Sequence, residues 1–533
     1  MEIELKFQVP PASRPAVARA LAGADSKLLR LQAQYFDTAD RALARSGLAL
    51  RVRREGRRWV QTLKGAGDGL FQRVEHEVPV AAPAGIVPTV DPARHDGTAA
   101  GAALRSVLGD AALLPTYGTT VSRRTRVLRS GGARIELALD IGWLDGGARR
   151  LALHELEFEL LGGKLPALFA AAGQWAGRHG LVLDIRSKAE RGDRLARGET
   201  AGPARKAQPL QLPPGVGADA AVRAIVANCL RQILGNASEI AHDEQRPAHV
   251  HQLRVGLRRL RTALRELGAL APDASPDWAE PLEALFRELG VVRDRDALAQ
   301  GLLPALHAAG AGPVPLPPLP QVQPPQQLLA AGAVTKLWLE LLAFAAGGAP
   351  ATAAARVKPP AATPADAGPP QPPPPPQPYE PSAHADPAGA VPAAAPDDGG
   401  DAATDGAFAP AAARRLRRLH RQVRRDAERF ELLDDEHRHR LRKRLKRLRY
   451  LCEFAASCFD AQAMQAYLKQ LTPAQEALGE FNDVCVARAL LQPAAATDPA
   501  AAYAAGWLAH EYTDALRRCG PPLANLREAQ PFW

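Results

Sequence analysis

The feature that most constrains this chain is the alternation of charged and apolar residues in several short segments between residues 1 and 201. It begins with Glu2-Ile3-Glu4-Leu5-Lys6 and returns in LALRVRR, RIELALD and LHELEFEL, with glycine-rich breaks between segments. Successive side chains of a β-strand point to opposite faces, so each segment would place its charges on one face and its apolar residues on the other. We therefore expect residues 1–201 to be mainly antiparallel β-sheet.

The charged faces of at least six of these segments consist mainly of arginine and glutamate. One solvated strand gives the same alternation, but solvated faces also mix in serine, threonine and glutamine. A closed barrel lined by both signs of charge is unfavourable unless the charges are paired, hydrated or bound to a ligand. Carboxylates suit a hard cation such as Mg²⁺ or Mn²⁺, and arginines suit phosphate oxygens. The pattern indicates an antiparallel β-barrel that forms a tunnel for a metal-chelated oligophosphate.

The rest of the chain has a different periodicity. After a proline-rich linker at 202–214, apolar residues recur at helical spacing, beginning with AAVRAIVANCLRQIL. We expect residues 215–533 to form an all-α helical bundle, which makes the chain an α+β protein of two domains. A Pro/Ala-rich stretch at about 346–410 lacks the apolar residues needed to fold, so we expect a disordered insertion there. Just before it, residues 326–344 predict one helix of the bundle.

Composition limits the partners and the compartment. The formal net charge is +10, with a pI of about 9.6, which favours a polyanionic partner. The five cysteines form no CxxC pair, which fits a reducing cytoplasm. No apolar stretch approaches the roughly 20 residues that span a bilayer, so we expect a soluble protein with no membrane partner and no secretion signal.

The helical half contains an internal repeat. HQLRVGLRRLR at 251–261 aligns with HRLRKRLKRLR at 439–449. At 100° per residue, each copy forms a leucine face and an opposite basic face. The basic faces consist of His251, Arg254, Arg258 and Arg261 in the first copy and of His439, Arg442, Lys446 and Arg449 in the second. Like charges so spaced oppose helix formation, so the repetition favours an anionic ligand over an ordinary solvated face.

In residues 1–201 the motifs occur in an order that resembles the CYTH family, also called triphosphate tunnel metalloenzymes. They are the ExExK motif Glu2 to Lys6, the strand Arg51-Val52-Arg53, the TLK ending at Lys64, the EIELEL-like strand from Glu155, and SKAERG from Ser187. The resemblance implies metal-dependent hydrolysis of inorganic triphosphate, with Mg²⁺ or Mn²⁺ held by some of Glu2, Glu4, Glu155 and Glu157. It implies phosphate binding by Lys6, Arg51, Arg53, Lys64, Arg124, Arg126 and Lys188, where strand parity favours Arg124 and Arg126 over Arg123.

The same resemblance implies which residues take part in the chemistry. Arg51, Arg53 and Lys64 would neutralise charge in the transition state. A carboxylate, of which Glu157 is one candidate, would activate the attacking water. The preferred triphosphate is left open among inorganic triphosphate, thiamine triphosphate and a nucleotide.

Residues 215–533 resemble the CHAD domain, through the two basic repeats and through Leu289-Gly-Val-Val-Arg293-Asp294. CHAD domains are regarded as binders of inorganic polyphosphate, so the resemblance implies that ligand at the two basic faces. Association with polyphosphate granules in the cytoplasm would follow from such binding.

Three alternatives stay open at this stage. CYTH barrels include class IV adenylate cyclases, so the barrel could be a lyase that acts on ATP. A non-catalytic polyphosphate tether would use the same charges for binding alone. Nucleic-acid binding by the basic helices is the least supported, because few aromatic residues accompany the basic faces for base stacking.

Overall fold

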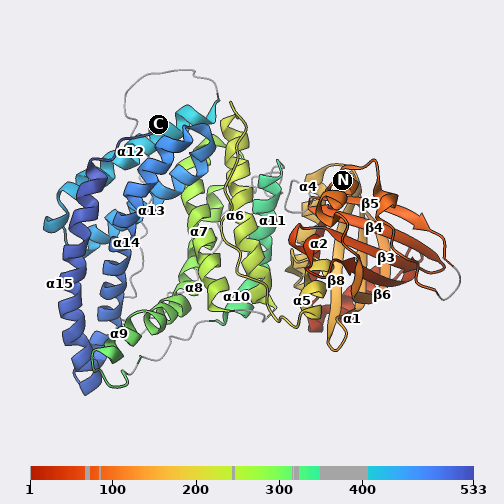
Figure 1. The fold of residues 1–533 in the computed structure, drawn as a ribbon, viewed down its shortest axis with the longest axis horizontal. Helices are drawn as coiled ribbons and strands as arrows, with labels where there is room; N and C mark the ends of the chain where they lie inside the picture. Colours follow the sequence, from red (N-terminus) through yellow and green to blue (C-terminus); the bar gives the residue numbers. More distant parts are fainter. Residues whose placement is uncertain are drawn as a thin grey trace, which may run out of the picture.

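The computed structural model describes residues 2–66, 72–82, 86–242, 246–314, 316, 323–347 and 406–533. A sheet part is followed by a helical part (Figure 1). The strands are β1 (Glu2–Gln8), β2 (Lys27–Asp37), β3 (Ala49–Glu55), β4 (Arg58–Ala66), β5 (Gln72–Val80), β6 (Leu114–Ser130), β7 (Ala133–Asp145), β8 (Arg150–Gly162) and β9 (Val182–Leu183). The helices that accompany them are α1 (Arg14–Leu21), α2 (Ala42–Arg45), α3 (Ala99–Leu108), α4 (Leu165–His179) and α5 (Lys188–Ala196).

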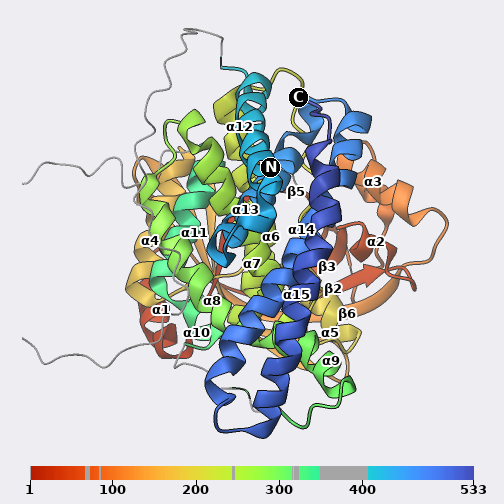
Figure 2. The same ribbon diagram turned by 90° about the vertical axis from the view of Figure 1, so that its left-hand side faces the viewer.

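The helical part extends from α6 onward. Its helices are α6 (Ala218–Ala241), α7 (Pro247–Leu267), α8 (Ala279–Gln300), α9 (Leu302–Ala308), α10 (Pro325–Ala330), α11 (Gly332–Ala345), α12 (Phe408–Glu428), α13 (Asp435–Ala455), α14 (Ala461–Leu491) and α15 (Pro499–Arg527). Figure 2 shows α12 to α15 stacked in front of α6 and α7. An antiparallel sheet domain followed by a helical domain is therefore confirmed.

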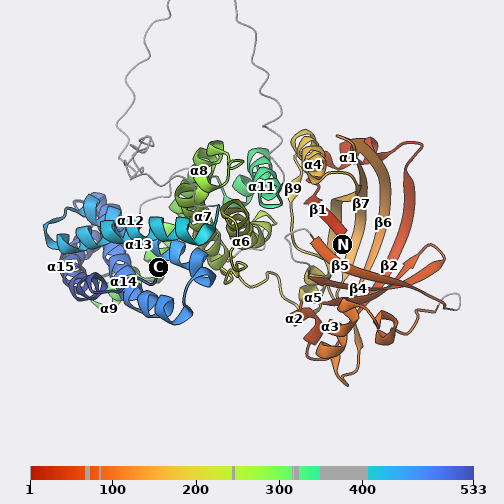
Figure 3. The same ribbon diagram turned by 90° about the horizontal axis from the view of Figure 1, so that it is seen from above.

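The described strands form one sheet in the order β5-β4-β3-β2-β6-β7-β8-β1-β9, with antiparallel neighbours. The predicted closed barrel needs a correction, because no full-length ladder joins the two ends of this sheet. The short β1 divides one edge between two partners: Glu2 and Ile3 pair with β5, while Phe7 and Gln8 pair with β9. The curl of the strands brings β1 beside β5 (Figure 3).

The two faces of the sheet have opposite character. Phe7 of β1 and Phe158 of β8 are fully buried on the outer face, with their ring centroids 5.5 Å apart in an edge-to-face arrangement. The helix α4 covers this apolar face. Because side chains alternate along each strand, the charged residues must lie on the inner face. The predicted separation of charged and apolar faces is confirmed for these strands.

The leucine faces of the two basic repeats are buried as predicted. Leu253, Leu257 and Leu260 of α7 have no exposed surface, and neither do Leu441, Leu445 and Leu448 of α13. Burial of each such side chain contributes about 1.5–3 kcal/mol, so these leucines fix which face each helix presents outward.

The apolar core continues from the outer face of the sheet into the helical part. A single cluster of buried side chains includes Phe158, Leu168 of α4, Leu230 of α6 and Leu337 of α11. The helix α11 lies between α6 and α4 (Figure 1). The two parts therefore share one continuous core.

Two predictions about the region before α12 have different outcomes. The helix predicted at residues 326–344 is divided into α10 and α11, because Ala331 is extended, with φ −64° and ψ 137°. Most of the predicted insertion, residues 348–405, lies outside the described residues. Its predicted end at about residue 410 overlaps α12, which begins at Phe408.

Candidate functional site

Strand register gathers the charged residues of the sheet on one face. Directly paired residues of neighbouring strands point to the same side of a sheet. Lys6 pairs with Glu157 and Gln8 with Glu155, while Asp140 pairs with both Glu155 and Arg123. The same register continues through the strands on the other side, where it adds Tyr35, Arg51, Arg53, Lys64, Glu75 and Glu77. The inner face therefore carries side chains of both charges.

Lys188 occupies the centre of a carboxylate cluster on this face. It is the first residue of α5, which the side chain of Ser187 caps by accepting a hydrogen bond from the Glu190 amide at 3.0 Å. The Lys188 Nζ lies 2.9 Å from both Asp140 Oδ2 and Glu155 Oε2, and it also donates to Glu157. Burial alone would lower the pKa of Lys188, but Asp140 and Glu157 raise it above its usual range. The ammonium therefore stays charged.

Arg123 completes this cluster from β6. Its guanidinium binds Asp140 through two parallel contacts of 2.7 Å, and it reaches Glu157 Oε2 at 2.5 Å. Burial alone would raise the pKa of Glu157, but Lys188 and Arg123 hold that pKa well below its usual range. Lys188 and Arg123 lower the pKa of Asp140 as well, so both carboxylates are kept ionised inside the sheet.

A second group of cations lies across the inner face on β3 and β4. Arg51 donates to the Tyr35 hydroxyl at 3.2 Å and lies 3.7 Å from Glu75, to which Lys64 is also joined at 2.7 Å. Burial and the neighbouring Arg51 lower the pKa of Arg53. Positive charges crowded in this way are suited to an anion that touches several of them at once.

The acidic residues of the inner face are of the type that binds divalent cations, but they are not arranged as a preformed metal site. No group of three or more His, Cys, Asp or Glu side chains is spaced to hold a metal ion in the part of the chain that the structure describes. Glu155 Oε2 is nevertheless buried without a hydrogen bond, 2.9 Å from the Lys188 ammonium. Burial and the like charges of Glu136 and Glu4 raise the pKa of Glu159. A dication would relieve both conditions.

The helical part brings the two basic faces together. Arg254 of α7 donates to the Phe286 carbonyl at 2.6 Å, and its guanidinium lies 4.2 Å from the centre of that ring. Arg258 faces the same ring at 5.4 Å. Burial, followed by the charges of Arg258 and Arg442, lowers the pKa of Lys446 of α13 to about 6. Cations from α7 and α13 therefore face each other at close range.

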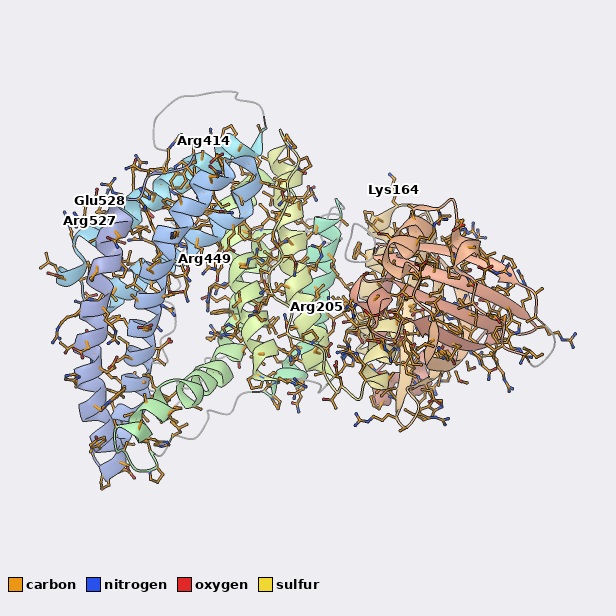
Figure 4. The ribbon with its side chains drawn as sticks, viewed as in Figure 1. Lys164, Arg205, Arg414, Arg449, Arg527 and Glu528 are labelled. Carbon is orange, nitrogen blue, oxygen red and sulfur yellow. The ribbon has the colours of Figure 1, made fainter. Side chains whose placement is uncertain are left out.

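Each basic face ends in an ion pair. Arg261 lies 3.2 Å from Glu283 of α8, and Arg449, labelled in Figure 4, lies 2.9 Å from Glu453 of its own helix. At the other end of α13, His439 shares a hydrogen bond of 2.9 Å with Asn482 of α14. The strongest concentration of positive charge is thus in the middle of the two faces.

Comparison with known families now separates the two parts. The model of the CYTH domain matches residues 1–192, and the model of the CHAD domain matches residues 224–492. The chain belongs to the CHAD family, and a CYTH domain precedes its CHAD domain. The resemblance seen in the sequence motifs is therefore confirmed.

Parts of the chain are similar to individual known proteins. An inorganic triphosphatase from Haemophilus influenzae is 28% identical over 202 residues, which are 36% of this chain and 54% of that protein. The chain thus spans about half the length of this curated relative. Among solved structures, the CHAD domain from the plant Ricinus communis is 26% identical, covers 62% of this chain and 99% of that one, and has a TM-score of 0.43. A putative adenylyl cyclase from Hippeastrum, reported to have a dominant triphosphatase activity, is 17% identical, covers 37% and 96% of the two chains, and has a TM-score of 0.28.

Most of the residues predicted for the CYTH site share its inner face. Those brought together there are Glu4, Lys6, Arg51, Arg53, Lys64, Glu155, Glu157 and Lys188. The side chain of Glu2 lies outside the described residues. Arg124 and Arg126 occupy the opposite parity of β6, and Arg126 donates to the Ala20 carbonyl behind the sheet at 3.0 Å. Arg123 takes the inward position that strand parity had assigned to Arg124 and Arg126.

Sequence reasoning also passed over several residues of the CYTH site. Arg123 was missed because the run RRTR offers an arginine at either parity, and only its pairing with Asp140 decides between them. Asp140 was seen as a charged strand residue but not as a site residue. Arg191, which binds Glu155, belongs to the SKAERG motif, so that motif could have identified it.

The residues predicted for the CHAD domain divide into a central group and a peripheral group. Arg254, Arg258, Arg442 and Lys446 interact electrostatically across α7 and α13. Arg261 and Arg449 are ion-paired, His439 is hydrogen-bonded, and His251 is exposed at the start of α7. The side chains of Arg293 and Asp294 lie outside the described residues. No helix among the described residues is both long and apolar enough to cross a bilayer.

Proposed function

We propose that the CYTH domain hydrolyses inorganic triphosphate with the help of Mg²⁺ or Mn²⁺, on the inner face of a tunnel-like sheet. The observation that carries this proposal is the Lys188 cluster, in which buried carboxylates and cations of several elements converge. Such an arrangement is stable only with balanced charge, and a metal-bound oligophosphate brings both signs at once. The Haemophilus influenzae relative, an inorganic triphosphatase, supports the substrate.

The inner face supplies groups for both parts of such a substrate. Phosphate oxygens would be held by Lys6, Arg51, Arg53, Lys64, Arg123 and Lys188, which would also neutralise charge that develops on the departing group. The metal would be held by carboxylates from Glu2, Glu4, Glu155 and Glu157. When bound, such an ion polarises phosphoryl oxygens and orients them for attack by water. Lys188 becomes available to the phosphate chain once it is released from its carboxylates.

A proton must leave the attacking water. The depressed pKa of Glu157 makes it a weak proton acceptor while Lys188 and Arg123 hold it. Glu159 is on the same face, and its raised pKa makes it the better acceptor. Glu159 is therefore a second candidate for the general base, beside Glu157.

The CHAD domain is proposed to bind inorganic polyphosphate between α7 and α13. Arg254, Arg258 and Arg442 supply positive charge there, close enough to lower the pKa of Lys446. A chain of phosphates can contact several of these cations in succession, and such an anion would raise the lowered pKa of Lys446.

The experiment that tests the proposed reaction is orthophosphate release from tripolyphosphate by the full-length protein and by the double variant Glu155→Gln/Glu157→Gln. We expect the double variant to lose metal-dependent release by at least about 100-fold. Arg126→Gln, on the back of the same sheet, is the matched control and should retain turnover. Unchanged release by a folded double variant would contradict the proposed mechanism.

A further inference from the structure

A continuous path of buried and partly buried polar contacts connects the Lys188 cluster to the CHAD domain. The Gln8 side-chain amide donates to Glu155 Oε1 at 2.8 Å and to Asp184 Oδ2 at 3.0 Å. Asp184 in turn accepts from Arg186 Nε at 3.0 Å, and Arg186 Nη1 donates to Glu239 Oε2 at 3.2 Å. Glu239 belongs to α6. Three intermediates therefore separate a carboxylate of the CYTH site from one of the CHAD domain.

Glu239 is an unusual residue for a domain contact because it is only 3% exposed. Its second oxygen accepts from Arg194 of α5 at 2.6 Å, so a single CHAD carboxylate neutralises two CYTH arginines. Asp184 is fully buried, and Arg186 is 2% exposed. Buried charges of this kind are costly unless each is paired, so the loss of one carboxylate must disturb its partners.

The path ends on the oxygen of Glu155 that does not face Lys188. Glu155 Oε1 is held by Gln8 and Arg191, whereas Oε2 lies toward Lys188 without a hydrogen bond. A carboxylate that binds a metal through one oxygen commonly has its other oxygen fixed by hydrogen bonds, and those partners contribute strongly to metal affinity.

We propose that Glu239 of the CHAD domain is a positioning residue for the CYTH site, acting through Arg186, Asp184 and Gln8 on the orientation of Glu155. The inference rests on the proposed function in assigning Glu155 to the metal. Glu239 touches neither substrate nor metal. Its role is to neutralise Arg186 and Arg194, so that the side chains of Asp184 and Gln8 keep their positions relative to Glu155.

The test compares three full-length variants by titration with Mn²⁺ and by steady-state kinetics. Glu239→Gln keeps the shape but removes the charge, and Glu239→Asp restores the charge. Asn236→Ala is the matched control. Asn236 lies one turn earlier on α6 and is fully buried, and it bonds the backbone of Arg205 (labelled in Figure 4) at 3.0 and 2.9 Å without joining the path.

We expect Glu239→Gln to weaken Mn²⁺ binding on the order of 10-fold, as loss of a partner behind a metal ligand typically does. Its kcat should fall at saturating Mn²⁺, with a smaller change in the KM for tripolyphosphate. Glu239→Asp should recover part of the Mn²⁺ affinity. Asn236→Ala should lower the melting temperature without changing Mn²⁺ affinity.

The proposal is overturned if Glu239→Gln binds Mn²⁺ as tightly as the unmodified protein, if neither has a saturable Mn²⁺ site, or if Asn236→Ala weakens binding equally. The proposed function fails separately. If the unmodified protein binds Mn²⁺ but releases no orthophosphate, the triphosphatase assignment is lost, while the comparison of affinities still decides the role of Glu239.

Discussion

Replacing Lys188 by methionine tests whether this side chain occupies the place of a metal ion. The inner cluster contains three carboxylates, from Asp140, Glu155 and Glu157, and three cations, from Lys188, Arg123 and Arg191. Lys188→Met keeps most of the side-chain volume and removes the cation that Asp140, Glu155 and Glu157 share. The variant should therefore be less stable than the unmodified protein in the absence of metal and should attract a dication more strongly.

The size of the effect follows from the burial of the pair. The Lys188 side chain is 14% exposed, and those of Asp140 and Glu155 are 1% and 0% exposed. Removing one partner of a buried ion pair costs about 3–5 kcal/mol in the free energy of unfolding. The depressed pKa values of Asp140 and Glu157 contribute stability above their unfolded values and lose it as pH falls. The difference between variant and unmodified protein should thus be full at pH 7 and shrink on acidification.

The assay is urea unfolding of both proteins at pH 7, with EDTA and with Mn²⁺. At a Mn²⁺ concentration of 100 times the Kd of the variant, the free energy of unfolding of the variant should rise by about 2.7 kcal/mol. The unmodified protein should gain less at the same concentration, because its Kd for Mn²⁺ should be higher. Orthophosphate release should nevertheless fall by about 100-fold, because a phosphate contact is lost. Equal stability in EDTA, or equal gain from Mn²⁺, would refute the reasoning.

Three further substitutions test the CYTH site and the CHAD site separately. Arg123→Leu should lower orthophosphate release by about 100-fold, whereas Arg126→Leu should leave it unchanged, because only Arg123 reaches the carboxylates; equal losses would show that strand parity was assigned wrongly. Lys446, with a pKa of about 6, is mostly neutral at pH 7.5, so polyphosphate binding there should take up a proton and weaken as pH rises above 6. Calorimetry in two buffers of different ionisation enthalpy measures this uptake, which Lys446→Met should abolish. Gly290→Ala would place a Cβ 2.5 Å from Arg254 Nη1 and should weaken polyphosphate binding while orthophosphate release stays constant; a parallel fall in both would argue against separate sites.

The sequence could predict the sheet's faces because charge alternation has the period of a strand. Glu4, Lys6 and Glu157 share a face in any register consistent with that period. The inward arginine of β6 could not be predicted in this way, because Arg123, Arg124 and Arg126 cover both parities. Only the ladder between β6 and β7, which pairs Arg123 with Asp140, decides which arginine faces the carboxylates.

The contact between the domains could not be read from the sequence for a different reason. The sequence around Asp184, Arg186 and Glu239 has no marked periodicity that would single out these charges. Their pairing depends on how α6 docks onto the sheet domain. By contrast, the leucine faces of α7 and α13 were predictable because burial of one helical face follows directly from spacing. Local patterns thus identified the two candidate sites, and tertiary packing determined which residues support them.

The central claim is best tested by measuring the products formed by the purified full-length protein from tripolyphosphate, thiamine triphosphate and ATP, each with Mg²⁺, Mn²⁺ or EDTA. The account predicts orthophosphate from tripolyphosphate, dependent on Mg²⁺ or Mn²⁺ and absent with EDTA. Cyclic AMP and pyrophosphate from ATP would instead indicate a cyclase. Tight binding of tripolyphosphate with no orthophosphate under any metal would contradict the account and leave a protein that only binds its phosphate chains.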